Sequence, residues 1–439
     1  MSRTRVLVTG AAGFIGRAVC AALLEAGHEV AGYDALLEQV HGSDALWPEI
    51  PQFKGMSLVE IADVRDRFCL SKVLCAFRPH VVVHLAAEVG VGQAEYAIER
   101  YVDCNVRGTS VLLEEILRAN DSVADDADGI RRLVVAGSMS SYGEGLYVCP
   151  THGPIRPHRT ADRLAEGLWA PACQLESVPG SGQLCPTAEE LSPIPITEQF
   201  SLRPTGIYAA TKRDQEELSL FVHRSYGLSV GVARLWNVYG PGQALGNPYT
   251  GVAAIFAARC LAGLAPRVYE DGAQVRDLVH VRDVAAAFVA LVGDSNTRLA
   301  AREWSDPRRI GPFNVSTGHP TTVARIAELA CEVLAPELAP ELTGQYRAGD
   351  IRACLGSPER LHALTGWRPH VEPEIGLREL FEFLRDQAPA PESSEHLEAA
   401  HDELARRSLV VDSIRETDDD LSATPGGGAW TEPDAPGRT

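Results

Sequence analysis

The feature that most constrains the fold is the glycine-rich turn in VTGAAGFIG, which joins the first apolar run of the chain to its first amphipathic segment. Gly10, Gly13 and Gly16 let a backbone turn tightly, approach a ligand closely and pack against the following helix. The amino end of that helix presents unpaired N–H groups and the positive end of its dipole. The spacing therefore predicts a strand–turn–helix unit that binds a pyrophosphate, although a turn that only packs would also use glycines.

Two kinds of pattern alternate from residue 3 to about residue 140. Short β-branched runs are typical of buried parallel strands, and the amphipathic stretches between them are typical of helices. The runs are RVLVTG, EVAGYD, SLVEIADV, HVVVHLAA and RLVVAGS, and the helical stretches include GRAVCAALLEAG and NVRGTSVLLEEILRAN. This alternation predicts an α/β fold, a doubly wound parallel (Rossmann) sheet whose ligand lies at the carboxyl ends of the strands.

Composition divides the rest of the chain. Residues 144–200 combine Pro, Gly, two His and three Cys without a long periodic element, which predicts an insertion. We expect a dinucleotide-binding domain over residues 1–240, including that insertion, and a smaller, mainly substrate-binding C-terminal lobe over residues 241–386. Residues 387–439, with 12 acidic and 4 basic residues, predict a mostly disordered tail with room for one short helix near SSEHLEAAHDELARRSLVV.

Charge and hydropathy exclude several classes of protein. A formal net charge of -19 argues against a nucleic-acid partner, because neutralising phosphates needs clustered Lys and Arg. The stretch GVAAIFAARCLAGLAP contains Arg259 and is too short to cross a bilayer, so no membrane partner is expected. The first residues lack a signal peptide, and the ten cysteines lack disulfide-scaffold spacing. We expect a soluble, cytoplasmic protein with reduced thiols.

Acidic residues at strand ends indicate which dinucleotide binds. Asp34 ends the second predicted strand, 24 residues after Gly10. A carboxylate there can accept hydrogen bonds from both ribose hydroxyls of NAD and would repel the 2′-phosphate of NADP, so NAD is favoured unless Asp34 only caps a helix. Asp63, with Val64, closes the third strand and could contact the adenine edge or cap the following helix.

Tyr208 and Lys212 in GIYAATK stand four residues apart, so they share one face of a helix. A phenol titrates near pH 10, and a nearby ammonium group favours the phenolate; lowering its pKa by about 3 units needs roughly 4 kcal/mol. With the positive ring of NAD also nearby, the spacing thus indicates a tuned acid/base pair. Alternatively, Tyr208 packs in the core and Lys212 is solvated.

Five motifs, TGAAGFIG, HLAAEVGV, NVRGT, AGSMSSYG and YAATK, together resemble the extended short-chain dehydrogenase/reductase family, within it the nucleotide-sugar epimerases and dehydratases. The resemblance covers about residues 3–386. It implies that Ser138 assists Tyr208, that NAD is the cofactor, and that two copies pair through two long helices as a homodimer. The cofactor contacts that it implies are Gly10, Gly13, Phe14, Ile15, Gly16, Asp34, Asp63, Val64, Leu85, Ala86, Ala87, Asn105, Tyr208 and Lys212.

The same resemblance extends to a nucleotide-sugar substrate. RLWNVYGPG places Asn237 near the phosphates, DGAQVRDLVHVRDVA places Arg276 on the diphosphate, and YRAGDIR places Arg347 and Asp350 on the diphosphate and ribose. Guanidinium groups suit a diphosphate because they form two directed, charge-assisted bonds, although each could instead be a surface ion pair. Further substrate contacts are expected from Glu88, Val89 and Ser138.

The residues after Ser138 bear on the reaction. Family dehydratases carry an Asp-Glu pair there, whereas this chain has Met139 and Ser140, so the resemblance implies 4-epimerisation through transient oxidation at carbon 4. GPGQALGNPYTGVAAIF and the insertion beginning YVCPTHG are similar to dTDP-L-rhamnose 4-epimerases; UDP-galactose and UDP-glucuronate epimerases are competitors. Another dehydratase or reductase, or a non-catalytic NAD-binding sensor or scaffold, stays open, although sensors commonly lose the tyrosine or lysine that this chain keeps.

The insertion carries a candidate metal site. Cys149 and His152 form a C-x-x-H pair, and Cys173 and Cys185 follow in a Pro/Gly-rich stretch. Four such ligands could form a closed tetrahedral zinc site that stabilises a loop without a core. Related insertions carry a tighter second pair, where this chain has Glu176, so reduced thiols without a metal are the alternative.

Overall fold

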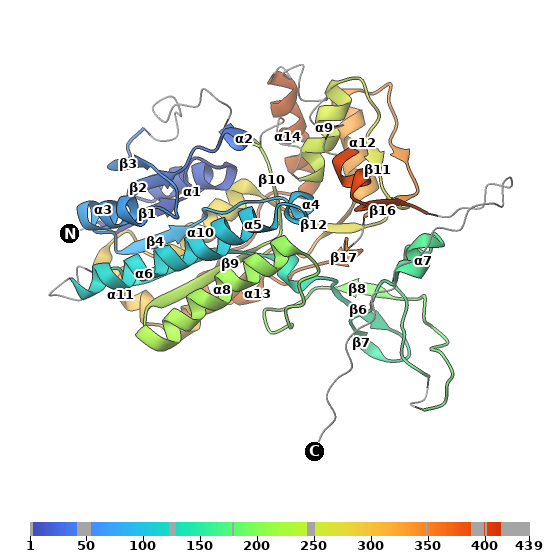
Figure 1. The fold of residues 1–439 in the computed structure, drawn as a ribbon, viewed down its shortest axis with the longest axis horizontal. Helices are drawn as coiled ribbons and strands as arrows, with labels where there is room; N and C mark the ends of the chain where they lie inside the picture. The colour runs from blue at the N-terminus through green and yellow to red at the C-terminus, as the bar shows by residue number, and fades with distance from the viewer. Residues whose placement is uncertain are drawn as a thin grey trace.

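The computed structural model describes residues 3–41, 54–122, 129–177, 180–243, 251–347, 349–387, 399 and 402–413. At its centre lies a seven-stranded parallel sheet with the strand order β13-β9-β5-β4-β1-β2-β3 (Figure 1). The strand order reverses between β1 and β4, which is where such sheets bind ligands. The predicted fold class is confirmed. The strands are β1 (Arg5–Thr9), β2 (Glu29–Asp34), β3 (Leu58–Ile61), β4 (Val81–His84), β5 (Arg132–Ser138), β9 (Ser229–Leu235) and β13 (Gly311–Val315).

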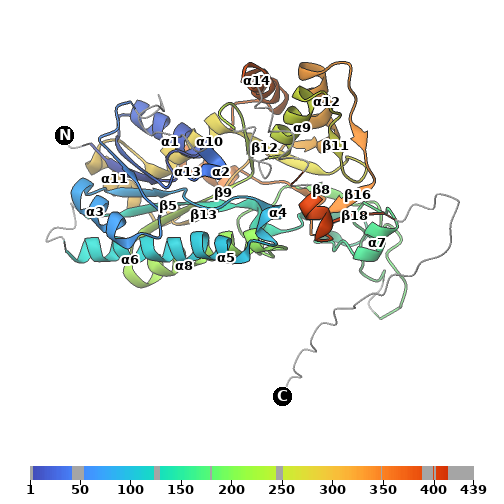
Figure 2. The ribbon, with the colours of Figure 1, turned by 45° about the horizontal axis from the view of Figure 1, so that its top comes forward.

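Helices cover both faces of the sheet (Figure 2). Successive side chains of β1 alternate between the two cores, with Val6 and Val8 in one and Leu7 in the other. Because both faces are buried, the strands read as continuous apolar runs. One face is covered by α1 (Phe14–Glu25), α10 (Val281–Val292), α11 (Thr297–Trp304) and α13 (Glu359–Thr365), and the other by α3 (Arg67–Phe77), α6 (Gly108–Asp121) and α8 (Ile207–Tyr226).

A second lobe follows β9 and has its own sheet and core. Its sheet consists of β10 (Asn237–Tyr239), β12 (Val275–His280), β14 (Pro320–Thr322) and β17 (Ala353–Cys354), and its helices are α9 (Val252–Leu261), α12 (Val323–Leu334) and α14 (Pro373–Asp386).

Smaller elements occur in both parts of the described chain. They are α2 (Glu38–His41), α4 (Val91–Ala94), α5 (Ile98–Tyr101), η3 (Val102–Arg107), η5 (Met139–Tyr142), η6 (Pro307–Arg309), β11 (Arg267–Val268) and β15 (Glu341–Leu342).

A buried carboxylate, Asp277 on β12, joins the loops of this lobe. It accepts hydrogen bonds from the backbone N–H groups of Thr317 (2.8 Å), Gly318 (2.9 Å) and Gly356 (3.0 Å). Replacing Asp277 with alanine leaves these buried donors unpaired, so we expect the free energy of unfolding to fall by about 3 kcal/mol in urea titrations. The exposed Asp162→Ala is the control, and a loss below about 1 kcal/mol for Asp277→Ala would contradict this role.

The predicted insertion over residues 144–200 contains a three-stranded antiparallel sheet and one short helix in its described part. The sheet has the order β7-β6-β8, and Figure 1 shows it away from the central sheet. The elements are β6 (Leu146–Cys149), β7 (Gly153–Ile155), α7 (Ala161–Ala165) and β8 (Ser192–Ile194). The domain limits given above stay a prediction.

Part of the expected C-terminal tail packs against both the second lobe and α4. Residues 402–406 are helical, and β18 (Val410–Asp412) pairs antiparallel with β16 (Gln345–Arg347). Leu404 and Val410 are buried, so this part of the tail differs from a disordered extension because apolar side chains hold it in place. The other residues after 387, apart from residue 399, lie outside the described part of the chain.

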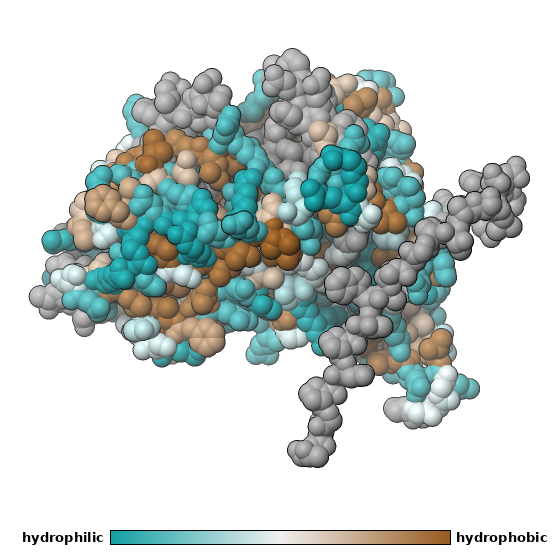
Figure 3. Space-filling view, in the orientation of Figure 1, coloured by the Kyte–Doolittle hydropathy of each residue, from teal (hydrophilic) through white to brown (hydrophobic). Residues whose placement is uncertain are grey.

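The surface carries apolar side chains along one side of the molecule. In Figure 3, brown side chains gather across the face where α5, α6 and α8 lie in Figure 1. Large apolar residues exposed on or beside these elements include Ile98, Val102 and Phe221. The expected homodimer and cytoplasmic location stay predictions. Among the described residues, no helix combines the length and apolar character needed to span a bilayer.

Candidate active site

The glycine-rich turn forms a close backbone cradle between β1 and α1. Gly10 has a positive φ of +71°, and a Cβ there would lie 2.7 Å from the nitrogen of Ala86 in the loop after β4. A Cβ on Gly16 would lie 2.0 Å from the carbonyl oxygen of Gly10. No side chain caps α1, which starts at Phe14 and continues with Ile15, so its first N–H groups can face a ligand.

Asp34 stands beside this cradle at the end of β2. Its Oδ2 accepts from the N–H of Ala12 at 2.9 Å and its Oδ1 from the N–H of Leu36 at 2.9 Å. The carboxylate is nearly buried and lies 3.8 Å from Nε2 of His41. Asp34 caps no helix of the described chain, which leaves the dinucleotide interpretation in place.

Asp63 is engaged by protein groups. Arg65 donates to it from its backbone N–H, and from Nε at 2.8 Å and Nη2 at 2.6 Å, which lowers the pKa of Asp63. The cap of α3 is Asp66, so the alternative that Asp63 caps this helix is wrong. Val64 is buried and packs against Gly108, where a Cβ would lie 2.6 Å from its Cγ1.

Residues after β4 are held by a buried asparagine. Asn105 accepts from the N–H of Glu88 at 2.7 Å and donates to its carbonyl oxygen at 3.1 Å. Leu85, Ala86 and Ala87 precede Glu88, and the backbone of Leu85 and Ala86 lies next to Gly10. Asn105 therefore fixes the backbone of this loop at Glu88. The Glu88 carboxylate binds Arg100 through two bonds of 2.8 Å, whereas Val89 is 57% exposed.

Tyr208 lies in the first turn of α8 and stacks edge-on against Tyr101, with ring centroids 6.4 Å apart. Ser138, at the end of β5, hydrogen-bonds to it, and the Ser138 hydroxyl also lies 2.8 Å from that of Ser140. Burial raises the pKa of Tyr208 to about 12, and the bond from Ser138 opposes this only in part. In the protein alone desolvation thus outweighs any charge that favours the phenolate, and the lowering expected from Lys212 together with the positive ring of NAD stays a prediction.

Lys212 is buried one turn further along α8. Its Nζ donates to Oε1 of Gln215 at 2.6 Å, while Nε2 of Gln215 donates to Thr109 at 2.7 Å. His84 bonds Thr109 from the other side at 2.9 Å. Burial lowers the pKa of Lys212 to about 8 and that of His84 to about 3, so His84 is neutral and adds no charge beside the lysine. The alternative of a solvated Lys212 is wrong.

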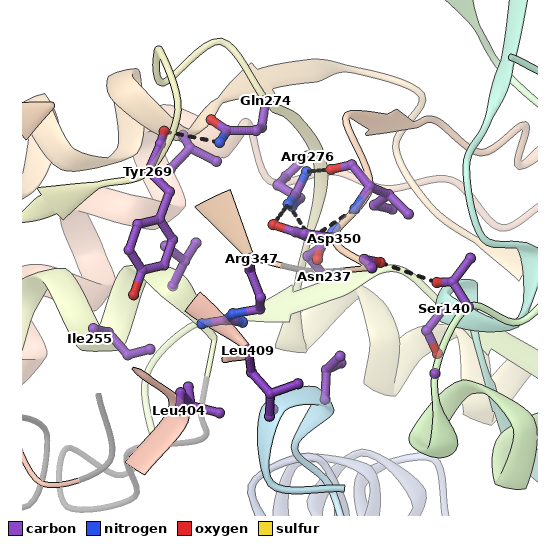
Figure 4. A pocket seen from close by; sticks show the side chains of 18 of the residues that line it. Ser140, Asn237, Ile255, Tyr269, Gln274, Arg276, Arg347, Asp350, Leu404 and Leu409 are labelled. Atoms are coloured by element: carbon purple, nitrogen blue, oxygen red, sulfur yellow. Dashed lines mark hydrogen bonds and ion pairs between the residues drawn. The ribbon is translucent and has the colours of Figure 1, made fainter. Parts of the chain in front are cut away.

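A cavity of about 550 Å³ lies between the two lobes, and residues of both lobes line it (Figure 4). Arg276 and Asp350 face each other on one wall, with Nη2 of the arginine 3.1 Å and 3.2 Å from the two carboxylate oxygens. Arg276 also donates to the carbonyl oxygens of Val275 and Ile351. These two predicted ligand contacts thus bind each other in the protein alone.

Arg347 and Asn237 also line the cavity. Figure 4 shows the Arg347 side chain extending into its middle, near Leu409. Nε of Arg347 is buried without a hydrogen-bond partner among the described residues. Asn237 donates one amide N–H to the carbonyl oxygen of Asp277 at 3.0 Å, which leaves the second amide N–H for a ligand. Arginine and amide groups are suited to phosphate oxygens.

The cavity wall also contains residues that the sequence motifs did not predict. Glu95 accepts from the N–H of Ile207 at 2.9 Å and so holds the start of α8. A Cβ on Gly206 would lie 2.5 Å from Oε1 of Glu95, which explains the glycine of GIYAATK. Leu404 and Leu409 of the C-terminal segment close another side. No local pattern could reveal contacts made across 112 residues, whereas the Lys212–Gln215 spacing on one helix face could have been noticed.

Met139 and Ser140 lie on the cavity wall, as the sequence places them directly after Ser138. The two carboxylates that line the cavity, Glu95 and Asp350, are both engaged, one by a backbone N–H group and the other by Arg276. The described wall thus offers no unengaged carboxylate. Residues 244–250 lie outside the described residues.

The four predicted metal ligands come together although the first and the last are 36 positions apart in the chain. Cys149, His152, Cys173 and Cys185 each offer one ligand atom, and these atoms lie within 4.8 Å of one another. The three cysteines are buried.

Comparisons with known proteins agree with this geometry. The model of the NAD dependent epimerase/dehydratase family matches residues 6–165 and 177–303. A dTDP-L-rhamnose 4-epimerase of Burkholderia thailandensis is 32% identical over 382 residues, 86% of this chain and 93% of its own. A UDP-glucose 4-epimerase of Mycolicibacterium smegmatis is 29% identical, over 88% of this chain and 99% of its own.

Solved structures are similar as well. The UDP-glucose 4-epimerase of Thermus thermophilus, solved in complex with NAD, superposes with a TM-score of 0.62 at 29% identity, over 87% of this chain and 99% of its own. The glycine cradle and the helix that carries Tyr208 and Lys212 thus agree with the matches over most of the chain in indicating one family. This chain belongs to the NAD dependent epimerase/dehydratase family.

Proposed function

We propose that this protein is a nucleotide-sugar 4-epimerase that uses NAD, with dTDP-L-rhamnose as substrate. The observation that carries the proposal is a cavity lined by Met139 and Ala209, the chain neighbours of Ser138 and Tyr208, whose lining carboxylates are both engaged. An elimination of water needs a further free acid or base, whereas inversion at carbon 4 does not. The relatives named above act on dTDP-L-rhamnose and UDP-glucose by their names, which supports inversion at this carbon.

The cradle fits NAD. Gly10 and Gly16 leave no room for side chains, and Asp34 suits a ribose with free hydroxyls and not a 2′-phosphate. When bound, NAD supplies the hydride acceptor at carbon 4 and a positive ring that favours the phenolate of Tyr208. This added charge is needed because burial alone raises the pKa of Tyr208 to about 12.

The protein groups then divide the work. Tyr208 takes the proton of the 4-hydroxyl during oxidation and returns it after the 4-keto sugar has turned over. Ser138 orients the same hydroxyl from the end of β5. Arg347, with its unpaired Nε, and Asn237 hold the diphosphate so that the sugar can rotate without leaving the cavity.

A panel of nucleotide sugars tests the proposal. The protein is incubated in D₂O with dTDP-L-rhamnose, UDP-glucose, UDP-glucuronate and dTDP-glucose, and the products are followed by NMR. We expect dTDP-L-rhamnose to give the 4-inverted sugar with its original hydrogen at carbon 4. Formation of a 4-keto-6-deoxy product from dTDP-glucose would favour a dehydratase, and turnover of no sugar despite bound NAD would favour a sensor.

A further inference from the structure

The insertion brings together four side chains that no step of the proposed reaction uses. Cys149 ends β6, His152 lies in the turn before β7, and Cys173 and Cys185 follow α7. We propose that these four residues form a structural zinc site that fixes the insertion. The inference is independent of the epimerase activity proposed above.

Three of the six distances between the ligand atoms are close to those around a tetrahedral ion with three sulfur ligands and one nitrogen ligand, and all six lie within 4.8 Å. With Zn–S near 2.3 Å and Zn–N near 2.0–2.1 Å, ligand atoms should be about 3.8 Å apart for two sulfurs and about 3.6 Å for sulfur and nitrogen. The Sγ atoms of Cys149 and Cys185 are 3.5 Å apart. Nδ1 of His152 is 3.7 Å from Sγ of Cys149 and 3.4 Å from Sγ of Cys173.

The imidazole is oriented for metal binding. Nε2 of His152 lies 2.8 Å from the carbonyl oxygen of Glu176. Since a carbonyl oxygen only accepts, Nε2 carries the proton, and in the neutral ring the lone pair is on Nδ1, which faces the thiols. Histidines that bind zinc are commonly fixed in this way by an acceptor on the second nitrogen. Glu176, which replaces the second thiol of the tighter pair, therefore supports the ligand with its backbone.

The surroundings suit a closed site. The exposed fractions of Cys149, Cys173 and Cys185 are 0%, 3% and 5%. The hydroxyl of Thr187 lies 3.5 Å from the Sγ atoms of both Cys149 and Cys185 and can donate to thiolates. Four protein ligands leave no open position, which is typical of structural and not catalytic zinc.

A metal would also explain how the insertion stays folded. The buried cluster at these ligands consists of the three cysteines, with Ile155, Ala188 and Leu191 packed against it, and a second small cluster joins Leu164 and Trp169 of the insertion to Tyr346. Such a small cluster cannot hold long loops in place, and a metal that binds only the folded form contributes its binding energy to folding. A Cys149–Cys185 disulfide is the competing interpretation, but it would give no role to Cys173 and His152.

Metal content and the spectrum of cobalt test the site on the full-length wild-type protein. Purified without chelators in reducing buffer, it should hold about one zinc per chain. After exchange with Co²⁺, we expect the strong visible bands of tetrahedral cobalt and thiolate-to-cobalt charge-transfer bands. Weak octahedral absorption, no bound metal, or a denatured mass lower by two hydrogens, which marks a disulfide, would each overturn the proposal.

Variants locate the ligands. Cys149→Ser and His152→Ala should weaken zinc binding on the order of 100-fold or more in competition with a chelator. Matched controls are Cys75→Ser, an exposed cysteine outside the insertion, and His158→Ala, an exposed histidine within it; both should keep their zinc. NAD binding checks that the Rossmann sheet stays folded. Retention of wild-type zinc by Cys149→Ser would also overturn the site.

Discussion

Replacing Tyr208 with phenylalanine should lower kcat by about 10³-fold, within the range that a positioned acid/base supplies. The change removes only the phenolic oxygen, so the stacking with Tyr101 and the start of α8 should persist. NAD affinity and the KM for the sugar should change little. The assay is the rate of inversion followed by NMR, together with NAD binding measured by fluorescence.

Tyr101→Phe is the matched control for this prediction. Its ring contacts Tyr208, and its hydroxyl donates to Oε1 of Gln93 at 3.1 Å. We expect a change in kcat of less than about 10-fold for the control, because the hydroxyl of Tyr101 takes no part in proton transfer to or from the sugar. Equal losses in both variants would show that Tyr208 acts through packing, and the proposed acid/base role would fail.

The sequence was sufficient to predict the sheet because local patterns determine it. Each β-branched run up to RLVVAGS became a parallel strand, and Asp34 stands at the end of β2 as its spacing predicted. Gly10 and Gly16 could also be predicted, because neighbouring backbone atoms come too close to these positions for any side chain. These features depend on residues near each other in the chain or on sterics that only glycine satisfies.

Contacts across long separations could not be read in this way. Motifs placed Arg276 and Asp350 on the ligand, but only the folded chain shows that they pair with each other. The contact of Glu95 with Ile207 has no sequence signature. The packing of segment 402–413 could not be predicted, because its few apolar residues stand in an acidic stretch and its strand pairs with β16, which is far away in the sequence.

The pKa of Tyr208 shows why a correct motif can give an incomplete account of the chemistry. The spacing to Lys212 predicts an ionised phenol when the positive ring of NAD is also near, whereas in the protein alone burial raises the pKa of the tyrosine and lowers that of the lysine. Sequence spacing gives no measure of desolvation. The charge of Lys212 is therefore held at a cost in stability, and its removal should separate stability from activity.

Lys212→Met should lower kcat by about 10²-fold at pH 7, while moving the alkaline rise of the rate to higher pH, because the phenolate of Tyr208 loses a nearby cation. The loss should diminish as pH increases and more phenolate forms. The measurement is kcat between pH 6 and 10. The exposed Lys72→Met is the control and should leave the profile unchanged. A loss that is equal at every pH would show that Lys212 acts by position and not by charge.

The same variant should be more stable than the wild type at neutral pH. The pKa of Lys212 falls from 10.5 to about 8 on folding, so below pH 8 the folded state bears the full cost of a buried cation. Removing it should raise the free energy of unfolding by about 2 kcal/mol, after allowing for the acceptor left on Gln215. Between pH 8 and 10.5 the unfolded wild type binds more protons than the folded one, so its stability rises with pH and the advantage of the variant shrinks. Urea unfolding at pH 7 and pH 10 measures both values, and a variant less stable than the wild type at pH 7 would show that the buried ammonium group is stabilised by more than its bond to Gln215.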